Sequence, residues 1–216
     1  MTSRAMIIVG GGSSTRFGTD KLLAEVDGLP LVAYTIDNVV DHVDRCVVVC
    51  RPETVDAIQS LRPDVSVAAG GATRTLSEMA GLAALGGEHD LIGIHDAARP
   101  MVKGFVIDRL FALAERYGGA VPALTPDHVV LDRRTHQPLS SMRRAQTPQV
   151  FRGPELMAAY VRAAQVGYDG QDTSEIMERF AEVTIAALPG DPANLKVTYP
   201  DDIGVVRDHI TGRSRI

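Results

Sequence analysis

Only two cysteines are present, Cys46 and Cys50, and both lie in one apolar run, Cys46-Val47-Val48-Val49-Cys50. If this run is a strand, four steps of roughly 3.3 Å place the two residues about 13 Å apart. A disulfide needs Cα atoms within about 7 Å, so these cysteines cannot pair with each other. We therefore expect two buried thiols that behave as small hydrophobic side chains.

Long apolar runs and excess positive charge are also lacking. No stretch approaches the ~20 apolar residues of a membrane span, and the apolar segment 6–9 is too short for the core of a signal peptide. The net charge of −5 disfavours wrapping of nucleic acid, although a local basic pocket can still bind a small anion. No repeat or low-complexity linker interrupts the 216 residues, so we expect one cytoplasmic domain with neither nucleic acid nor membrane as partner.

Strand patterns alternate with helix patterns along the chain. Strands are predicted at 5–9, 45–50, 65–69, 91–95, 119–124, 183–188 and 195–198, and helices at 31–40, 52–61, 73–85, 106–117, 154–164, 173–180 and after Pro200. This alternation is typical of an α/β fold, in which helices cover both faces of a mostly parallel sheet. Residues 125–142 break the pattern and predict an excursion such as a hairpin, which needs a packing partner, for instance a second subunit.

The first strand runs into a glycine-rich loop, Gly10-Gly11-Gly12-Ser13-Ser14-Thr15-Arg16-Phe17-Gly18, with Asp20-Lys21 just behind it. Glycine N–H groups can approach an anion closely, and Arg16 and Lys21 add positive charge. The spacing fits neither the Walker loop nor the dinucleotide fingerprint, because Thr15 stands where the last fingerprint glycine would be. We predict a phosphate-binding loop; the alternative is a glycine-rich surface turn.

Two further strand ends carry polar groups. In Gly70-Gly71-Ala72-Thr73-Arg74-Thr75-Leu76-Ser77 a glycine pair precedes a helix, whose free N–H groups can bind a base or a phosphate, unless Thr73 is simply its N-cap. In His95-Asp96-Ala97-Ala98-Arg99-Pro100 the carboxylate suits Mg²⁺ or a ribose hydroxyl, unless it only pairs with Arg99. Because ligands collect at the carboxyl ends of parallel strands, we expect the three loops to form one site.

Three further features are interpreted from their local pattern. His95 is expected to be a packed, hydrogen-bonded core residue rather than a catalytic base. The segment Ala145-Gln146-Thr147-Pro148-Gln149 has the polar character of a pocket wall or of a plain loop. Lys196, between Leu195 and Val197, either points to solvent or reaches a bound anion.

Taken in order, these motifs resemble those of the cytidylyltransferases that act on polyol phosphates, most closely the 2-C-methyl-D-erythritol 4-phosphate cytidylyltransferase family of isoprenoid synthesis. The matching blocks are the first loop, Gly70 to Ser77, His95 to Pro100, Gln146-Thr147-Pro148-Gln149 and Asn194-Leu195-Lys196-Val197-Thr198. The resemblance implies a Rossmann-like α/β domain spanning residues 1–216, CTP as substrate, Mg²⁺ as cofactor, and a homodimer formed through a protruding β-arm at about 125–145.

The resemblance also implies roles for individual residues and a reaction. Arg16, Lys21 and Lys196 would contact the triphosphate as catalytic cations, and Asp96 would bind the metal. The nucleotide-binding positions would be Gly10, Gly11, Gly12, Gly70, Gly71, Arg74, Ser77, Asp96, Ala97, Arg99 and Thr147. The acceptor's phosphate oxygen would attack the α-phosphorus of CTP; because this nucleophile is already an anion, cations and positioning are needed rather than a base.

Several positions depart from the family pattern, in the acceptor half and in the opening loop. Leu139 stands where relatives carry an arm arginine associated with the acceptor's phosphate, and His128 and Gln171 stand where they tend to have threonines. Gly10-Gly11 replaces a more usual alanine pair, and Ser14 replaces a glycine. The missing cation can come from one of four nearby arginines: Arg133, Arg134, Arg143 or Arg144.

Three alternative functions stay open at this point. The acceptor can be another sugar or polyol phosphate, such as ribitol 5-phosphate, or the chain can be a non-catalytic nucleotide-binding homologue. An NAD-dependent oxidoreductase is disfavoured, because the first loop lacks the third glycine and is followed by cations.

Overall fold

The computed structural model describes residues 2–12, 17–18, 20–125, 133–134 and 143–212. Arg16 of the first loop lies outside these residues, as do His128, Leu139 and most of the predicted arm at about 125–145. The roles that the family resemblance implies for those positions therefore stay predictions.

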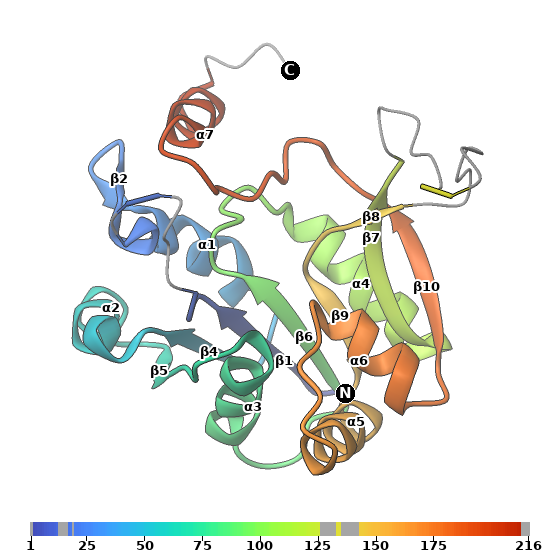
Figure 1. Cartoon of the computed structure of the whole chain (residues 1–216). Helices are drawn as coiled ribbons and strands as arrows, with labels where there is room; N and C mark the ends of the chain where they lie inside the picture. The colour runs from blue at the N-terminus through green and yellow to red at the C-terminus, as the bar shows by residue number, and fades with distance from the viewer. Residues whose placement is uncertain (1, 13–16, 19, 126–132, 135–142, 213–216) are drawn as a thin grey trace.

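An eight-stranded sheet forms the centre of the described structure, with strand order β10-β7-β9-β6-β1-β4-β5 and β8 paired to β7 (Figure 1). The strands are β1 (Arg4–Val9), β4 (Arg45–Cys50), β5 (Ser66–Ala69), β6 (Leu91–Asp96), β7 (Gly118–Leu124), β8 (Arg144–Ala145), β9 (Gln149–Arg152) and β10 (Thr184–Pro189). A small separate sheet joins β2 (Glu25–Val26) to β3 (Leu29–Pro30). Strand β1 pairs in parallel with both β4 and β6, which confirms the predicted mostly parallel α/β sheet.

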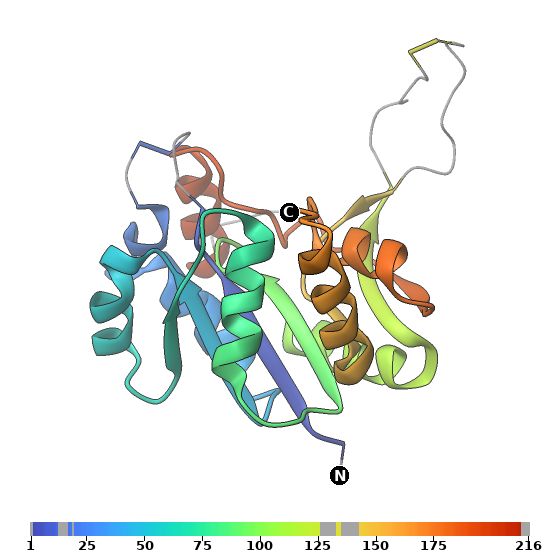
Figure 2. The same cartoon turned by 60° about the horizontal axis from the view of Figure 1, so that its bottom comes forward.

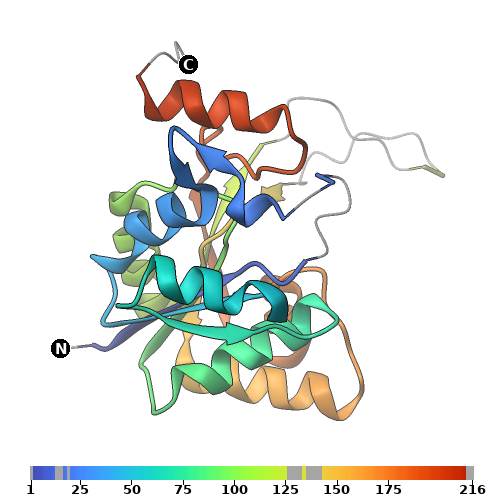
Figure 3. The ribbon, with the colours of Figure 1, turned by 90° about the vertical axis from the view of Figure 1, so that its left-hand side faces the viewer.

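Helices cover both faces of the sheet. They are α1 (Leu31–Val40), α2 (Val55–Leu61), α3 (Arg74–Leu85), α4 (Gly104–Tyr117), α5 (Gly153–Gln165), α6 (Thr173–Phe180) and α7 (Asp202–Ile210), with 3-10 turns η1 (Lys21–Leu23) and η2 (Pro52–Thr54). Helices α3 and α5 lie against one face (Figure 2), and α1 and α4 pack on the other. Figure 3 shows α7 beside the small β2–β3 sheet, where Val26 and Val206 share an apolar cluster.

Side chains along β1 alternate between the two faces of the sheet, so this strand contributes to the apolar core on each face. Met6 and Ile8 belong to the core beneath α1 and α4, whereas Ile7 and Val9 belong to the core beneath α3 and α5. Successive residues of a strand point to opposite faces, so a continuously apolar strand is what a sheet covered on both sides requires.

Both cysteines are buried and free in β4, as expected. Burial raises the pKa of the Cys46 thiol to about 12, so it stays protonated and unreactive.

One predicted strand is wrong. Residues 195–198 form no strand; instead the backbone N–H of Val197 donates to the carbonyl of Ala98, 2.8 Å away. Strand β9 was not predicted, and it runs antiparallel between β6 and β7. Its four residues begin and end with polar Gln149 and Arg152, which leaves too little periodicity for a strand signal.

Among the described residues, no helix is both long and apolar enough to span a bilayer.

Candidate active site

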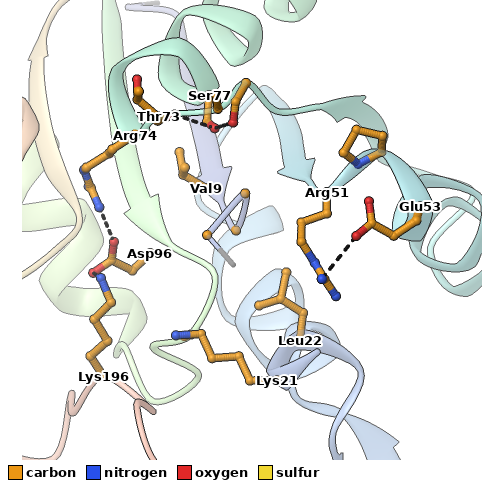
Figure 4. A pocket seen from close by; sticks show the side chains of 17 residues that line it. Val9, Lys21, Leu22, Arg51, Glu53, Thr73, Arg74, Ser77, Asp96 and Lys196 are labelled. Carbon is orange, nitrogen blue, oxygen red and sulfur yellow. Dashed lines mark hydrogen bonds and ion pairs between the residues drawn. The ribbon is translucent and has the colours of Figure 1, made fainter. Parts of the chain in front are cut away.

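A cavity of about 610 Å³ opens where β1, β4 and β6 end and α3 begins (Figure 4). Nine of the predicted site residues line it: Gly10, Gly11, Gly12, Lys21, Gly71, Arg74, Ser77, Asp96 and Lys196. The three loops that the sequence singled out thus meet in one pocket, together with the late lysine. Of the other predicted residues, Gly70, Ala97, Arg99 and Thr147 are not among its lining, and Arg16 is outside the described residues.

Asp96, the last residue of β6, is the electrostatic centre of the pocket and only 4% exposed. One carboxylate oxygen, Oδ1, lies 2.9 Å from Arg74 Nη1. The other, Oδ2, lies 3.0 Å from Arg99 Nε and 3.1 Å from Lys196 Nζ. Figure 4 shows Asp96 between Arg74 and Lys196, which reach it from opposite sides. Burial alone would raise the pKa of Asp96, but Lys196, Arg74 and Arg99 outweigh it and hold that pKa well below its usual value.

A hydrogen-bonded chain behind Asp96 fixes the end of β6. The backbone N–H of Asp96 donates to Thr147 Oγ1 at 2.9 Å, and the Thr147 hydroxyl lies 3.0 Å from His95 Nδ1. His95 Nε2 lies 3.1 Å from the carbonyl of Arg99, so the tautomer protonated at Nε2 satisfies every partner. Burial lowers the pKa of His95 to about 4, which keeps the ring neutral. His95 is therefore the packed core residue that was expected, and Thr147 supports the strand end from behind.

The segment that carries Lys196 is tied to the loop before β9. Gln146 Nε2 donates to the carbonyls of Asp191 at 2.9 Å and of Asn194 at 3.0 Å. Asn194 Nδ2 in turn donates to the carbonyl of Thr147 at 2.9 Å. These buried amides explain why glutamine and asparagine occur in both motifs: they join two segments distant in sequence and set where Lys196 enters the pocket.

Lys21 enters the pocket from the turn η1. Its Nζ donates to the carbonyl of Val197 at 3.1 Å, next to Lys196. Asp20 caps η1 by accepting from Leu22 N–H at 3.0 Å, and Arg51 Nη2 holds the same carboxylate at 2.7 Å. Sequence reasoning missed Arg51, which also lines the pocket. It directly follows the carboxyl end of β4, and that position was the available signal.

At the start of α3, both interpretations of the motif hold: Thr73 caps the helix, and the first turn also contributes to the pocket. Thr73 is the N-cap, since its side chain accepts from Leu76 N–H at 3.2 Å. Arg74 and Ser77, one turn apart, nevertheless both line the pocket. Gly71 allows the preceding loop to pack closely on the first turn of α3, because a Cβ at this position would lie 2.4 Å from Leu76 Cβ.

Gly71→Ala is expected to lower the free energy of unfolding by about 1–3 kcal/mol, the usual range for overpacking. The added methyl group would also come within 3.2 Å of the Leu76 backbone carbon, so the chain rather than a flexible side chain must move. Urea denaturation measures the effect. Gly204→Ala in α7 is the matched control, because a Cβ there meets no atom within 4 Å. Equal stability of Gly71→Ala and the wild type would show that the loop is not tightly packed on α3.

A glycine loop and two lysines around a buried aspartate, in a pocket at the carboxyl ends of parallel strands, define an α/β nucleotidyltransferase site. Residues 5–211 match the family model of 2-C-methyl-D-erythritol 4-phosphate cytidylyltransferase (IspD), and the chain belongs to that family.

Individual relatives agree with this assignment. The enzyme of that name from Carboxydothermus hydrogenoformans is 32% identical, over 94% of this chain and 93% of the relative. The one from Synechococcus sp. (strain CC9902) is 33% identical, over 97% of this chain and 98% of the relative. The solved structure of 4-diphosphocytidyl-2C-methyl-D-erythritol synthase from Anaerococcus prevotii has a TM-score of 0.85 at 23% identity, covers 97% of this chain and 99% of its own, and shows the same fold.

Proposed function

We propose that this enzyme transfers CMP from CTP to the phosphate of 2-C-methyl-D-erythritol 4-phosphate and releases pyrophosphate. The observation that carries the proposal is the convergence of Lys21, Arg74 and Lys196 with Asp96 in one pocket. Three cations and a glycine-rich wall suit a triphosphate far better than an uncharged ligand.

In this reaction a phosphate oxygen of the acceptor forms a bond to the α-phosphorus of CTP. The bond from that phosphorus to the bridging oxygen breaks, and pyrophosphate leaves with the electron pair. The attacking oxygen carries a negative charge, so no proton has to be removed, and the buried neutral His95 is not needed as a base. Lys21 and Lys196 would stabilise the charge that builds up on the phosphoryl oxygens, and Asp96 would keep Lys196 oriented until substrate binds.

Mg²⁺ is part of the proposal. Magnesium is commonly held by one or two carboxylates together with substrate phosphates. Within the described part of the chain no three His, Cys, Asp or Glu side chains cluster as a self-contained metal site. The carboxylate of Asp96 in the pocket therefore fits an ion that is bound jointly with the nucleotide. When bound, Mg²⁺ would neutralise phosphate charge, and Asp96 would be its protein ligand.

The acceptor is tested by measuring pyrophosphate release from CTP with 2-C-methyl-D-erythritol 4-phosphate and with ribitol 5-phosphate. We expect kcat/KM with the methylerythritol phosphate to be at least about tenfold higher, since a bound polar substrate group discriminates by 1.4 kcal/mol or more. Preference for ribitol 5-phosphate would reassign the acceptor. CTP binding without pyrophosphate release in the presence of either acceptor would identify a non-catalytic homologue.

The source of the acceptor's cation is part of the same proposal. Arg133, Arg134, Arg143 and Arg144 are all exposed; the first two are near the middle of the predicted arm in sequence and the last two are near its end. The homodimer through that arm and the cytoplasmic location remain predictions from the sequence, and sedimentation of the purified enzyme tests the first of them.

A further inference from the structure

Arg74 is held by two carboxylates at once. Its Nη1 pairs with Asp96 at 2.9 Å, and its Nε lies 2.8 Å from Oε1 of Glu78, one turn further along α3. The Asp96 contact is a hydrogen bond, whereas the Glu78 contact is an ion pair, because Arg74 Nε makes no hydrogen bond within the described residues. The two carboxylates lie beside different nitrogens of the guanidinium, so their attraction holds the group in place between them. Asp96 belongs to the pocket wall, whereas Glu78 does not line the pocket.

Glu78 is the centre of a buried polar cluster, which consists of Arg74, Glu78, Tyr160 and Thr173. Its carboxylate is 1% exposed. Tyr160 of α5 donates its hydroxyl to Oε2 at 2.5 Å, and Thr173 of α6 donates to Oε1 at 3.1 Å. Both donors are buried, with Tyr160 2% and Thr173 0% exposed. Three helices that are separate in sequence therefore contribute to holding one carboxylate.

An apolar side chain would be the simpler choice at this position. The neighbouring Tyr160 ring belongs to the apolar core between the sheet and helices α3, α5 and α6. Burying a carboxylate in such a core is unfavourable unless it is paired and hydrogen-bonded. Burial indeed raises the pKa of Glu78, even though Arg74, Tyr160 and Thr173 act in the opposite direction. Pure packing does not account for a glutamate here, but the orientation of Arg74 does.

We propose that Glu78 is a positioning residue for the nucleotide pocket: it orients Arg74, and Tyr160 and Thr173 hold it in place from α5 and α6. The inference rests on the proposed function, because it assumes that Arg74 contacts the bound nucleotide. It extends that function to residues that the ligand does not touch. Since Arg74 would contact the nucleotide equally in the ground state and the transition state, losing its orientation should weaken binding more than turnover.

Tyr160→Phe is the first test, because it removes one hydrogen bond and keeps the ring in the core. We expect the KM for CTP to rise about threefold to tenfold, the net value of one ordinary hydrogen bond, with kcat within about twofold of the wild type. Tyr34→Phe is the matched control: its hydroxyl donates to the carbonyl of Val26 at 2.7 Å, away from this cluster. Glu78→Gln, which keeps the shape and removes the charge, should raise the KM by about tenfold or more.

A second measurement reads the orientation of Arg74 without any ligand. The Nε–H signal of Arg74, assigned by its disappearance in Arg74→Lys, should be sharp in the ¹⁵N spectrum of the wild type and of Tyr34→Phe. In Tyr160→Phe and Glu78→Gln it should shift and broaden through faster exchange with water. An unchanged Arg74 signal together with an unchanged KM in Tyr160→Phe overturns the inference, even if Glu78→Gln does not fold. A wild type that binds no CTP overturns the proposed function instead, and the spectrum then still decides whether Glu78 orients Arg74.

Discussion

Lys196→Met is expected to lower kcat for pyrophosphate release by about 10²-fold or more, the usual cost of removing one preorganised charge-stabilising donor. The Lys196 side chain is 40% exposed, and its Nζ lies 3.1 Å from the carboxylate of Asp96 at the pocket wall. It is therefore anchored yet open to a ligand, as a residue that meets the developing phosphoryl charge should be. Lys21→Met should lower kcat to a similar extent, because Lys21 lines the same pocket.

The sequence supplies its own control for this experiment. It contains three lysines, Lys21, Lys103 and Lys196, and Lys103 is not among the residues that line the pocket. Lys103 Nζ also pairs with an aspartate, Asp191, at 2.8 Å and is 47% exposed, so Lys103→Met removes a comparable ion pair elsewhere. Its kcat should stay close to that of the wild type. Rates within about threefold of the wild type for both Lys21→Met and Lys196→Met would remove these two residues from the mechanism.

Acidification from pH 7 to pH 5 is expected to lower the free energy of unfolding by about 2 kcal/mol through His95 alone. The folded-state pKa of His95 is lowered to about 4 from its ordinary 6.5. In this window the unfolded chain binds a proton that the folded protein excludes, so stability falls as the pH falls. The physical cause is burial, which disfavours the charged imidazolium. Protonation of Nδ1 would also remove the acceptor for the Thr147 hydroxyl.

Urea denaturation at pH 7, 6 and 5 measures this effect, with His95→Gln as the comparison. The variant should be less stable at pH 7, because it loses packing, but its stability should fall less steeply between pH 7 and pH 5. Titration of Asp96 does not contribute to this change in stability. Its folded-state pKa is held below the ordinary value of 3.8, so its contribution is lost only at lower pH. Parallel slopes for the two proteins would show that His95 is not held neutral.

The parts of the fold and site that local sequence pattern predicted correctly share one property. Strand β1, the glycine pair before α3 and the end of β6 are each recognisable within about ten residues, through periodicity and glycine placement. The rule that ligands gather at the carboxyl ends of parallel strands then placed Gly10, Arg74 and Asp96 in one pocket. Thr73 as N-cap and His95 as a core residue follow from equally local chemistry.

Local sequence patterns could not predict the contacts that set the charge distribution in and behind the pocket. Lys196 reaches Asp96 across 100 positions of sequence, and Tyr160 reaches Glu78 across 82. Strand β9 inserts antiparallel between β6 and β7, which fixes the neighbouring Thr147 behind Asp96. Periodicity reports whether a side chain is buried, but not which distant side chain it meets. That choice follows from the order of strands in the sheet and from the hydrogen bonds that buried polar groups must find.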